Sequence, residues 1–248
     1  ANQLDAICTR IALRLNSERR SPLYNRISSE QSTSSDIAIS VTMSQIVDAL
    51  KRSTLVGTVD RPTRKLLPGP FYEKDPQSTV GRSVDLLIPY FKLFSEGAKE
   101  HWDLGNQANT SRVIGGHLNS SRGVGSLILL LSSLIEFIAG TFGENFRKMT
   151  PDVFVSNVQA YAQPLINYFR NPSFEDIRTF KRVTSGSGAA ASGMREMQKI
   201  IWVQDKTFLP KGLQQHLENE RLALKTDTTN LSDEIMVGLI DIAVGFLK

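Results

Sequence analysis

Apolar residues recur at helical spacing through most of the chain. The first such segment places four of them on one face, Leu4, Ile7, Ile11 and Leu15. Residues three or four positions apart share one side of a helix, so this spacing predicts a helix over residues 3–16. The same pattern predicts further helices over residues 84–102, 124–142, 151–169, 194–203 and 213–224, and one that begins at Ser232. The run 124–142 is apolar almost all round, which is typical of a helix buried in a core.

Two stretches depart from this pattern. Ile37, Ile39 and Val41 alternate with small residues, which predicts a short strand. Thr42 and Gln45 follow with the spacing of a capping box, so we expect a second helix from there. Residues 57–81 contain four prolines, and we expect them to form a long, irregular connection.

These patterns predict a mainly α fold with at most a small β element. We expect a basic N-terminal segment over residues 1–82, with a helix, a short strand, a helix and a Pro-rich connection, followed by a helical core domain over residues 83–248. The chain starts without Met and inside a predicted helix, so we expect it to be the helical C-terminal portion of a larger α/β protein. A single cysteine excludes an internal disulfide and fits a cytoplasmic location. Polar residues interrupt the run 124–142, so we expect no membrane span.

The positive charge is concentrated in the first third of the chain. The net charge is +4, and residues 1–82 hold 12 basic against 8 acidic residues. The candidate nucleic-acid contacts form two groups, Arg14, Arg19, Arg20 and Arg26, and then Arg61, Arg64 and Lys65. Two interpretations stay open, a solvated surface and a surface for an anionic partner such as DNA.

Two further segments are candidates for binding a phosphate. The Gly-rich residues 184–193 precede a predicted helix, and backbone N–H groups at a helix start attract anions. The turn over residues 119–123 precedes the most apolar helix in the same way. The candidate phosphate ligands are Arg122, Gly186, Gly188, Gly193 and Arg195. The alternatives are a packing turn for the glycine segment and a structural helix cap for residues 119–123.

No residue pattern indicates catalysis or metal binding. The glycine segment lacks the Lys-Ser/Thr pair of a Walker A loop. The three histidines are far apart in sequence, with no ligand spacing for zinc. We therefore predict no catalytic residue, no metal and no cofactor.

Several passages share an order of motifs with one known family. A helix ending at Trp102 leads into a polar, Gly-rich segment, and Asn-Ser-Ser-Arg-Gly at 119–123 then begins the apolar helix. Residues 12–27 contain Leu-Asn, Ser-Pro-Leu and Arg-Ile, and residues 186–213 join a glycine segment, a helix and a Phe-x-Pro-x-Gly-Leu ending. With the strand and helix at 39–50, these passages resemble the C-terminal half of DGQHR-domain proteins, a family that includes DndB-like regulators of DNA sulfur modification. The DGQHR signature itself would lie upstream of residue 1.

This resemblance implies a DNA-associated binding or regulatory protein of a bacterial DNA-modification or phage-defence system, with DNA as its partner. A second reading is an enzyme that processes nucleic acid or nucleotide, a ParB-like nuclease or nucleotidase with its catalytic part upstream. A third is a helical scaffold that forms homo-oligomers. For this chain we favour a binding role over an enzymatic one.

Overall fold

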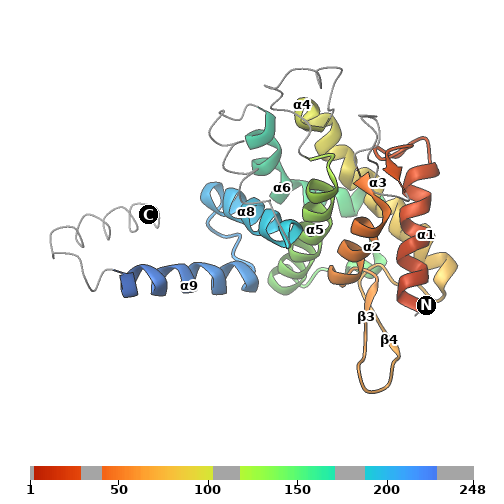
Figure 1. Ribbon diagram of the computed structural model, residues 1–248, viewed down its shortest axis with the longest axis horizontal. Helices are drawn as coiled ribbons and strands as arrows, with labels where there is room; N and C mark the ends of the chain where they lie inside the picture. Colours follow the sequence, from red (N-terminus) through yellow and green to blue (C-terminus); the bar gives the residue numbers. More distant parts are fainter. Residues whose placement is uncertain (1–2, 29–40, 103–117, 171–187, 228–248) are drawn as a thin grey trace.

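The computed structural model describes residues 3–28, 41–102, 118–170 and 188–227 (Figure 1). The helices are α1 (Gln3–Ser17), α2 (Met43–Arg52), α3 (Pro76–Gly97), α4 (Lys99–Trp102), α5 (Ser121–Phe142), α6 (Pro151–Arg170), α8 (Ala189–Gln204) and α9 (Lys211–Asp227), with a 3-10 turn, η2 (Phe146–Lys148). The strands are β1 (Ile27–Ser28), β2 (Val41–Thr42), β3 (Gly57–Val59) and β4 (Leu66–Pro68). The expected mainly α fold with a small β element is confirmed.

Helix α5 is the central helix of the structure. It packs against α2, α6 and α8, and 12 of its 22 residues are buried. Ser120 fixes its start, because the side chain accepts a hydrogen bond from the Gly123 N–H at 3.0 Å. Gly143 ends it with a φ of 70°, in the left-handed region that glycine adopts without strain. The predicted buried helix and its predicted serine cap are both confirmed.

Two serines interrupt the apolar sequence of α5, and both bond to neighbouring elements. Ser132 donates its hydroxyl to the Ser53 carbonyl, just after α2. Ser133 accepts a hydrogen bond of 2.6 Å from Nε2 of Gln198 on α8. Polar groups in a core cost free energy unless they are bonded, so these contacts favour one alignment of α2, α5 and α8.

Helix α3 is the second long core helix and contacts both α1 and α6. Asp75 caps it by accepting a hydrogen bond from the Ser78 N–H at 2.8 Å. Tyr90 lies fully buried in α3 and donates its hydroxyl to the Leu127 carbonyl of α5 at 2.9 Å. Burial raises the pKa of Tyr90 well above its usual value, so the phenol stays a neutral donor. The two long core helices are therefore joined by a polar contact as well as by packing.

The strands form two small sheets. β1 and β2 pair in parallel, with Ile27 opposite Val41. β3 and β4 form an antiparallel hairpin, with Gly57 opposite Pro68, and this hairpin projects from the body of the protein (Figure 1). The expected irregular connection over residues 57–81 is therefore wrong. Pro68 is the last residue of β4 and Pro76 the first residue of α3, while Pro62 and Pro70 lie outside the strands and helices. At such positions the missing N–H is tolerated.

The structure differs from two smaller expectations, and two others concern residues that it does not describe. Helix α8 begins at Ala189 instead of near Met194, because a run of alanines favours helix directly after the glycines. Thr42 does precede α2, but its side chain makes no capping bond. Its N–H instead donates to the Ser121 hydroxyl oxygen at 2.8 Å, which ties β2 to the start of α5. Residues 37–40 of the predicted strand and the helix predicted from Ser232 lie outside the described residues.

One hydrophobic cluster runs through the whole described part. It extends from Leu4 in α1 to Phe208 after α8, and so includes residues of both predicted segments. Helix α5 is long and apolar enough to cross a membrane by length and composition, but 67% of its most apolar window is buried within the protein. Its apolar surface is thus covered by other helices, as in a core helix.

Candidate functional site

The β3–β4 hairpin is held firmly to the body at its base. The Gly69 N–H donates to the Val56 carbonyl at 2.9 Å, and the Phe71 N–H donates to the Leu55 carbonyl at 2.8 Å. A side chain at Gly69 would place its Cβ only 2.2 Å from the Thr54 carbonyl oxygen, so the close approach requires glycine. Packing of Phe71 in the core, edge-on to a second phenylalanine, adds to this anchor.

A further contact secures the hairpin from the neighbouring 3-10 turn η2. Arg147 donates from Nη2 to the Pro68 carbonyl at 2.8 Å. The turn itself is held by Arg82, whose Nη2 donates to the Phe146 carbonyl at 2.6 Å. The hairpin therefore has a defined direction relative to the core.

The tip of the hairpin, residues 60–65, carries the second predicted basic group. Arg61, Arg64 and Lys65 are all exposed, and in the described part of the chain none of them forms an ion pair with a carboxylate. Asp60 is bonded instead to Thr63, through the hydroxyl and through the N–H at 3.0 Å. Both hydrogen bonds lower the pKa of Asp60, and the bond from the Thr63 hydroxyl has the larger effect. The exposed tip therefore carries three positively charged side chains, and its one carboxylate is hydrogen-bonded to Thr63.

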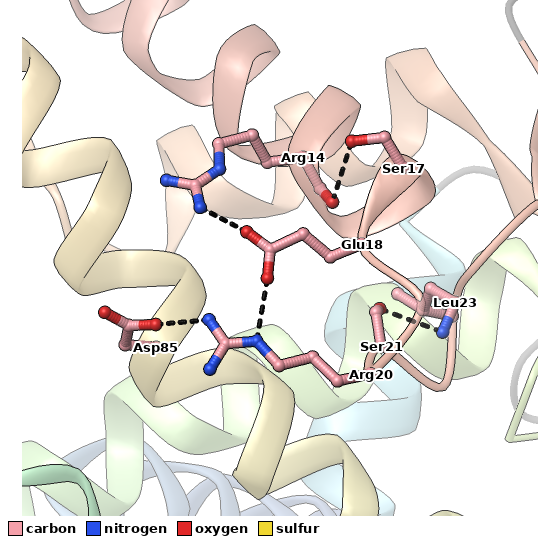
Figure 2. Close-up of polar contacts among 7 residues, drawn as sticks. All are labelled: Arg14, Ser17, Glu18, Arg20, Ser21, Leu23 and Asp85. Atoms are coloured by element: carbon pink, nitrogen blue, oxygen red, sulfur yellow. Dashed lines mark hydrogen bonds and ion pairs between the residues drawn. The ribbon is translucent and has the colours of Figure 1, made fainter.

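The first predicted basic group is partly neutralised within the protein, as Figure 2 shows. Glu18 accepts hydrogen bonds from both Arg14 and Arg20, and Arg20 also contacts Asp85 on α3. Burial opposes ionisation of Glu18, but the hydrogen bonds from Arg20 and Arg14 outweigh it and lower the pKa of the carboxyl. These arginines join α1 and the turn after it to α3, so much of their charge is already compensated.

The other two arginines of that group lie at a shallow groove of about 400 Å³. Arg19 and Arg26 line it together with Arg20, Lys92, Tyr24 and the acidic residue Glu96. Arg19 is exposed and makes no ion pair with any residue of the described segments. Trp102 also lines the groove but is only 2% exposed, so its ring face is not open for stacking. The end of α1 and helix α4, which adjoin this groove, lie at the opposite end of the body from the β3–β4 hairpin (Figure 1).

A pocket of about 250 Å³ brings together two of the predicted phosphate ligands, Arg122 and Gly188. Three helices form it, namely the beginning of α5, the beginning of α8 and the outer side of α2. Its lining residues are Gln45, Asp48, Ala49, Arg52, Ser121, Arg122, Gly188, Ala189 and Ala190. The two phosphate candidates come from segments that are more than 60 residues apart in sequence, and the fold places them beside one another.

Small residues allow these three helices to meet. A Cβ added to Gly125 of α5 would lie 3.1 Å from the Ala190 Cβ and 3.8 Å from the Ala49 Cβ. Larger side chains at this junction would separate the helices and widen the pocket floor. The hydrogen bond from the Thr42 N–H to the Ser121 hydroxyl oxygen holds the beginnings of α2 and α5 together.

The remaining phosphate candidates do not join this pocket. Gly193 is buried within α8, and Arg195 is exposed on the same helix but does not line the pocket. Gly186 lies outside the described residues. Sequence reasoning missed Arg52 and Asp48 as site residues, and considered Gln45 only as part of a capping box at the start of this helix. Their positions at every third or fourth residue of α2 were the available signal, because this spacing puts them on one side.

Neither a metal centre nor an activated nucleophile is found among the residues that the structure describes. No group of three or more His, Cys, Asp or Glu side chains is placed to hold a metal ion in these segments. Cys8 is fully buried, and burial, with Asp5 nearby, raises the pKa of its thiol to about 12. A thiol that stays protonated is a poor nucleophile.

Comparison with known proteins gives no relative. No protein-family model, no curated protein and no solved structure matches the chain.

Proposed function

We propose that this chain is a DNA-associated binding or regulatory protein that contacts the nucleic-acid backbone with its β3–β4 hairpin. The observation that carries the proposal is the hairpin tip, where Arg61, Arg64 and Lys65 are exposed and not paired with carboxylates of the described segments. Phosphate contacts from Arg and Lys supply most of the affinity of non-specific DNA binding, so unpaired cations on a projecting element suit this partner.

The rigid attachment of the hairpin supports the same proposal. Its two arms are hydrogen-bonded to each other at the base, where Leu55, Val56 and Phe71 are buried, and Arg147 of η2 donates to Pro68. Because the base is already ordered, binding costs less conformational entropy than it would for a free loop. A two-stranded ribbon is also narrow enough to enter a DNA groove.

The resemblance to DGQHR-domain proteins supports the proposal of a role in a bacterial DNA-modification or phage-defence system. It rests on the passages at 12–27, 39–50, 90–123 and 186–213. The hairpin cations belong to none of these passages, so the resemblance and the hairpin support DNA association independently.

The test compares duplex DNA binding by the parent with binding by the variant Arg61→Gln/Arg64→Gln/Lys65→Gln. The matched control is Arg10→Gln/Lys99→Gln/Lys211→Gln, which removes the same total charge from three exposed positions outside the hairpin. We measure fluorescence anisotropy of a labelled duplex at 0.1 M salt. Three lost phosphate contacts predict an affinity loss on the order of 100-fold for the hairpin variant. Equal losses of affinity in both variants would show that only the net charge of the protein matters, which would contradict the proposal.

A further inference from the structure

We propose that the pocket between α2, α5 and α8 binds the phosphate group of a phosphate monoester. This inference goes beyond the proposed DNA contact and does not depend on it, because the pocket shares no residue with the hairpin. Two arginines from different helices line one small cavity, Arg52 at the end of α2 and Arg122 in the first turn of α5.

The charge of the lining suits an anionic ligand. Neither Arg52 nor Arg122 forms an ion pair within the described part of the chain, and Asp48 is the only carboxylate among the lining residues. The beginnings of α5 and α8 each add roughly half a positive charge from the helix dipole, and the end of α2 at Arg52 adds roughly half a negative charge. The lining therefore keeps a net positive charge, which favours an anionic phosphate monoester. Planar guanidinium groups also match the oxygen spacing of phosphate.

Helix α8 leaves backbone donors available at the pocket. Its N-cap residue, Gly188, has a φ of 84° and supplies no capping side chain. The N–H groups of Ala189 and Ala190 have no acceptor among the described residues, and a helix beginning requires partners for such groups. A Cβ at Gly188 would meet no atom within 4 Å, so open space lies beside this backbone. A ligand oxygen can therefore approach these donors closely.

The size of the pocket restricts the ligand. At about 250 Å³ it is smaller than the roughly 300–1,000 Å³ of sites for drug-sized ligands. It has room for a phosphate and a sugar-sized group attached to it. Asp48 and Gln45 also line the pocket, and side chains of these types accept hydrogen bonds from sugar hydroxyls. The expected ligand is a phosphate monoester on a hydroxyl-bearing group. This group occurs both in free small molecules and at the phosphorylated end of a nucleic acid.

The test measures binding of adenosine 5′-monophosphate, inorganic phosphate and a single-stranded oligonucleotide with or without a 5′-phosphate, by isothermal titration calorimetry. The variant is Arg52→Gln/Arg122→Gln, and the control is Arg10→Gln/Lys99→Gln, which removes the same charge from exposed positions outside the pocket. Both pocket arginines are exposed, so the variant is expected to melt with the parent.

We expect at least one phosphate-bearing probe to bind the parent and the control, and to bind the pocket variant at least tenfold more weakly. Binding of the mononucleotide or inorganic phosphate identifies a free small molecule as the source, and a preference for the phosphorylated oligonucleotide alone identifies a nucleic-acid end. Absence of binding by every probe, or binding that the pocket variant retains in full, overturns the inference. The hairpin variant separates the two proposals, because it is expected to keep phosphate binding while it loses duplex affinity.

Discussion

The central position of α5 leads to a quantitative prediction for Leu131. This side chain is completely buried in the helix that contacts α2, α6 and α8. Leu131→Ala removes three carbon atoms from the core, which costs roughly 2.4 kcal/mol at about 0.8 kcal/mol for each. Incomplete collapse of the cavity adds to this, so we expect a total loss of about 3–4 kcal/mol. For a protein of this size, the melting temperature should fall by about 10 °C.

The assay is urea unfolding followed by circular dichroism, with Phe142→Ala as the matched control. Phe142 is the last residue of the same helix but is 60% exposed. Its truncation should cost less than about 1 kcal/mol, because most of the side chain is already in water. Equal losses for the two variants, or no loss for Leu131→Ala, would refute the assignment of α5 as the core helix.

Two further predictions follow from buried or bonded titratable groups. Because burial raises the pKa of Cys8 to about 12, its thiol should not react with Ellman's reagent at pH 8 in the folded protein, and should react fully in guanidinium chloride; rapid reaction of the folded protein would contradict this. Arg20 and Arg14 lower the pKa of Glu18 in the folded protein below its usual 4.5. Ionised Glu18 therefore stabilises the fold fully above pH 4.5. This stabilisation is lost as the pH falls through the lowered pKa of the folded protein. The parent should therefore be more stable than Glu18→Gln at pH 7, with the difference shrinking below pH 4.5; a constant difference down to pH 3 would show that the ion pairs contribute nothing.

Local patterns were sufficient to predict the long helices and the serine cap of α5, although α3 begins at Pro76, earlier than predicted, and ends at Gly97 before the separate helix α4. Hydrophobic spacing identified α5 because its apolar residues lie on nearly every side. The same reasoning placed the start of α8 too late, since it read Ala189 and its neighbours as part of a glycine loop. It also missed the β3–β4 hairpin, whose strands have only three residues each and whose second strand ends in a proline. Such short strands are stabilised mainly by contacts at their base, as with Gly69, and those contacts join residues that sequence spacing alone does not relate.

The candidate sites show the same limit. Charge counting identified Arg14 and Arg20 together with the hairpin cations, but only the fold shows that Glu18 and Asp85 compensate the first pair. Sequence reasoning likewise proposed Arg122 and Gly188 separately. Their meeting in one pocket depends on the packing of α2, α5 and α8, which is a tertiary property.

The most direct test of the DNA-binding proposal is the salt dependence of duplex affinity. The logarithm of the association constant falls linearly with the logarithm of salt concentration, by about 0.9 for each phosphate contact. Replacing Arg61, Arg64 and Lys65 by Gln should therefore reduce the magnitude of the slope by about 2.7. The control variant at Arg10, Lys99 and Lys211 should keep the parent slope. A hairpin variant with the parent slope would contradict the account, because the DNA contact would then lie elsewhere.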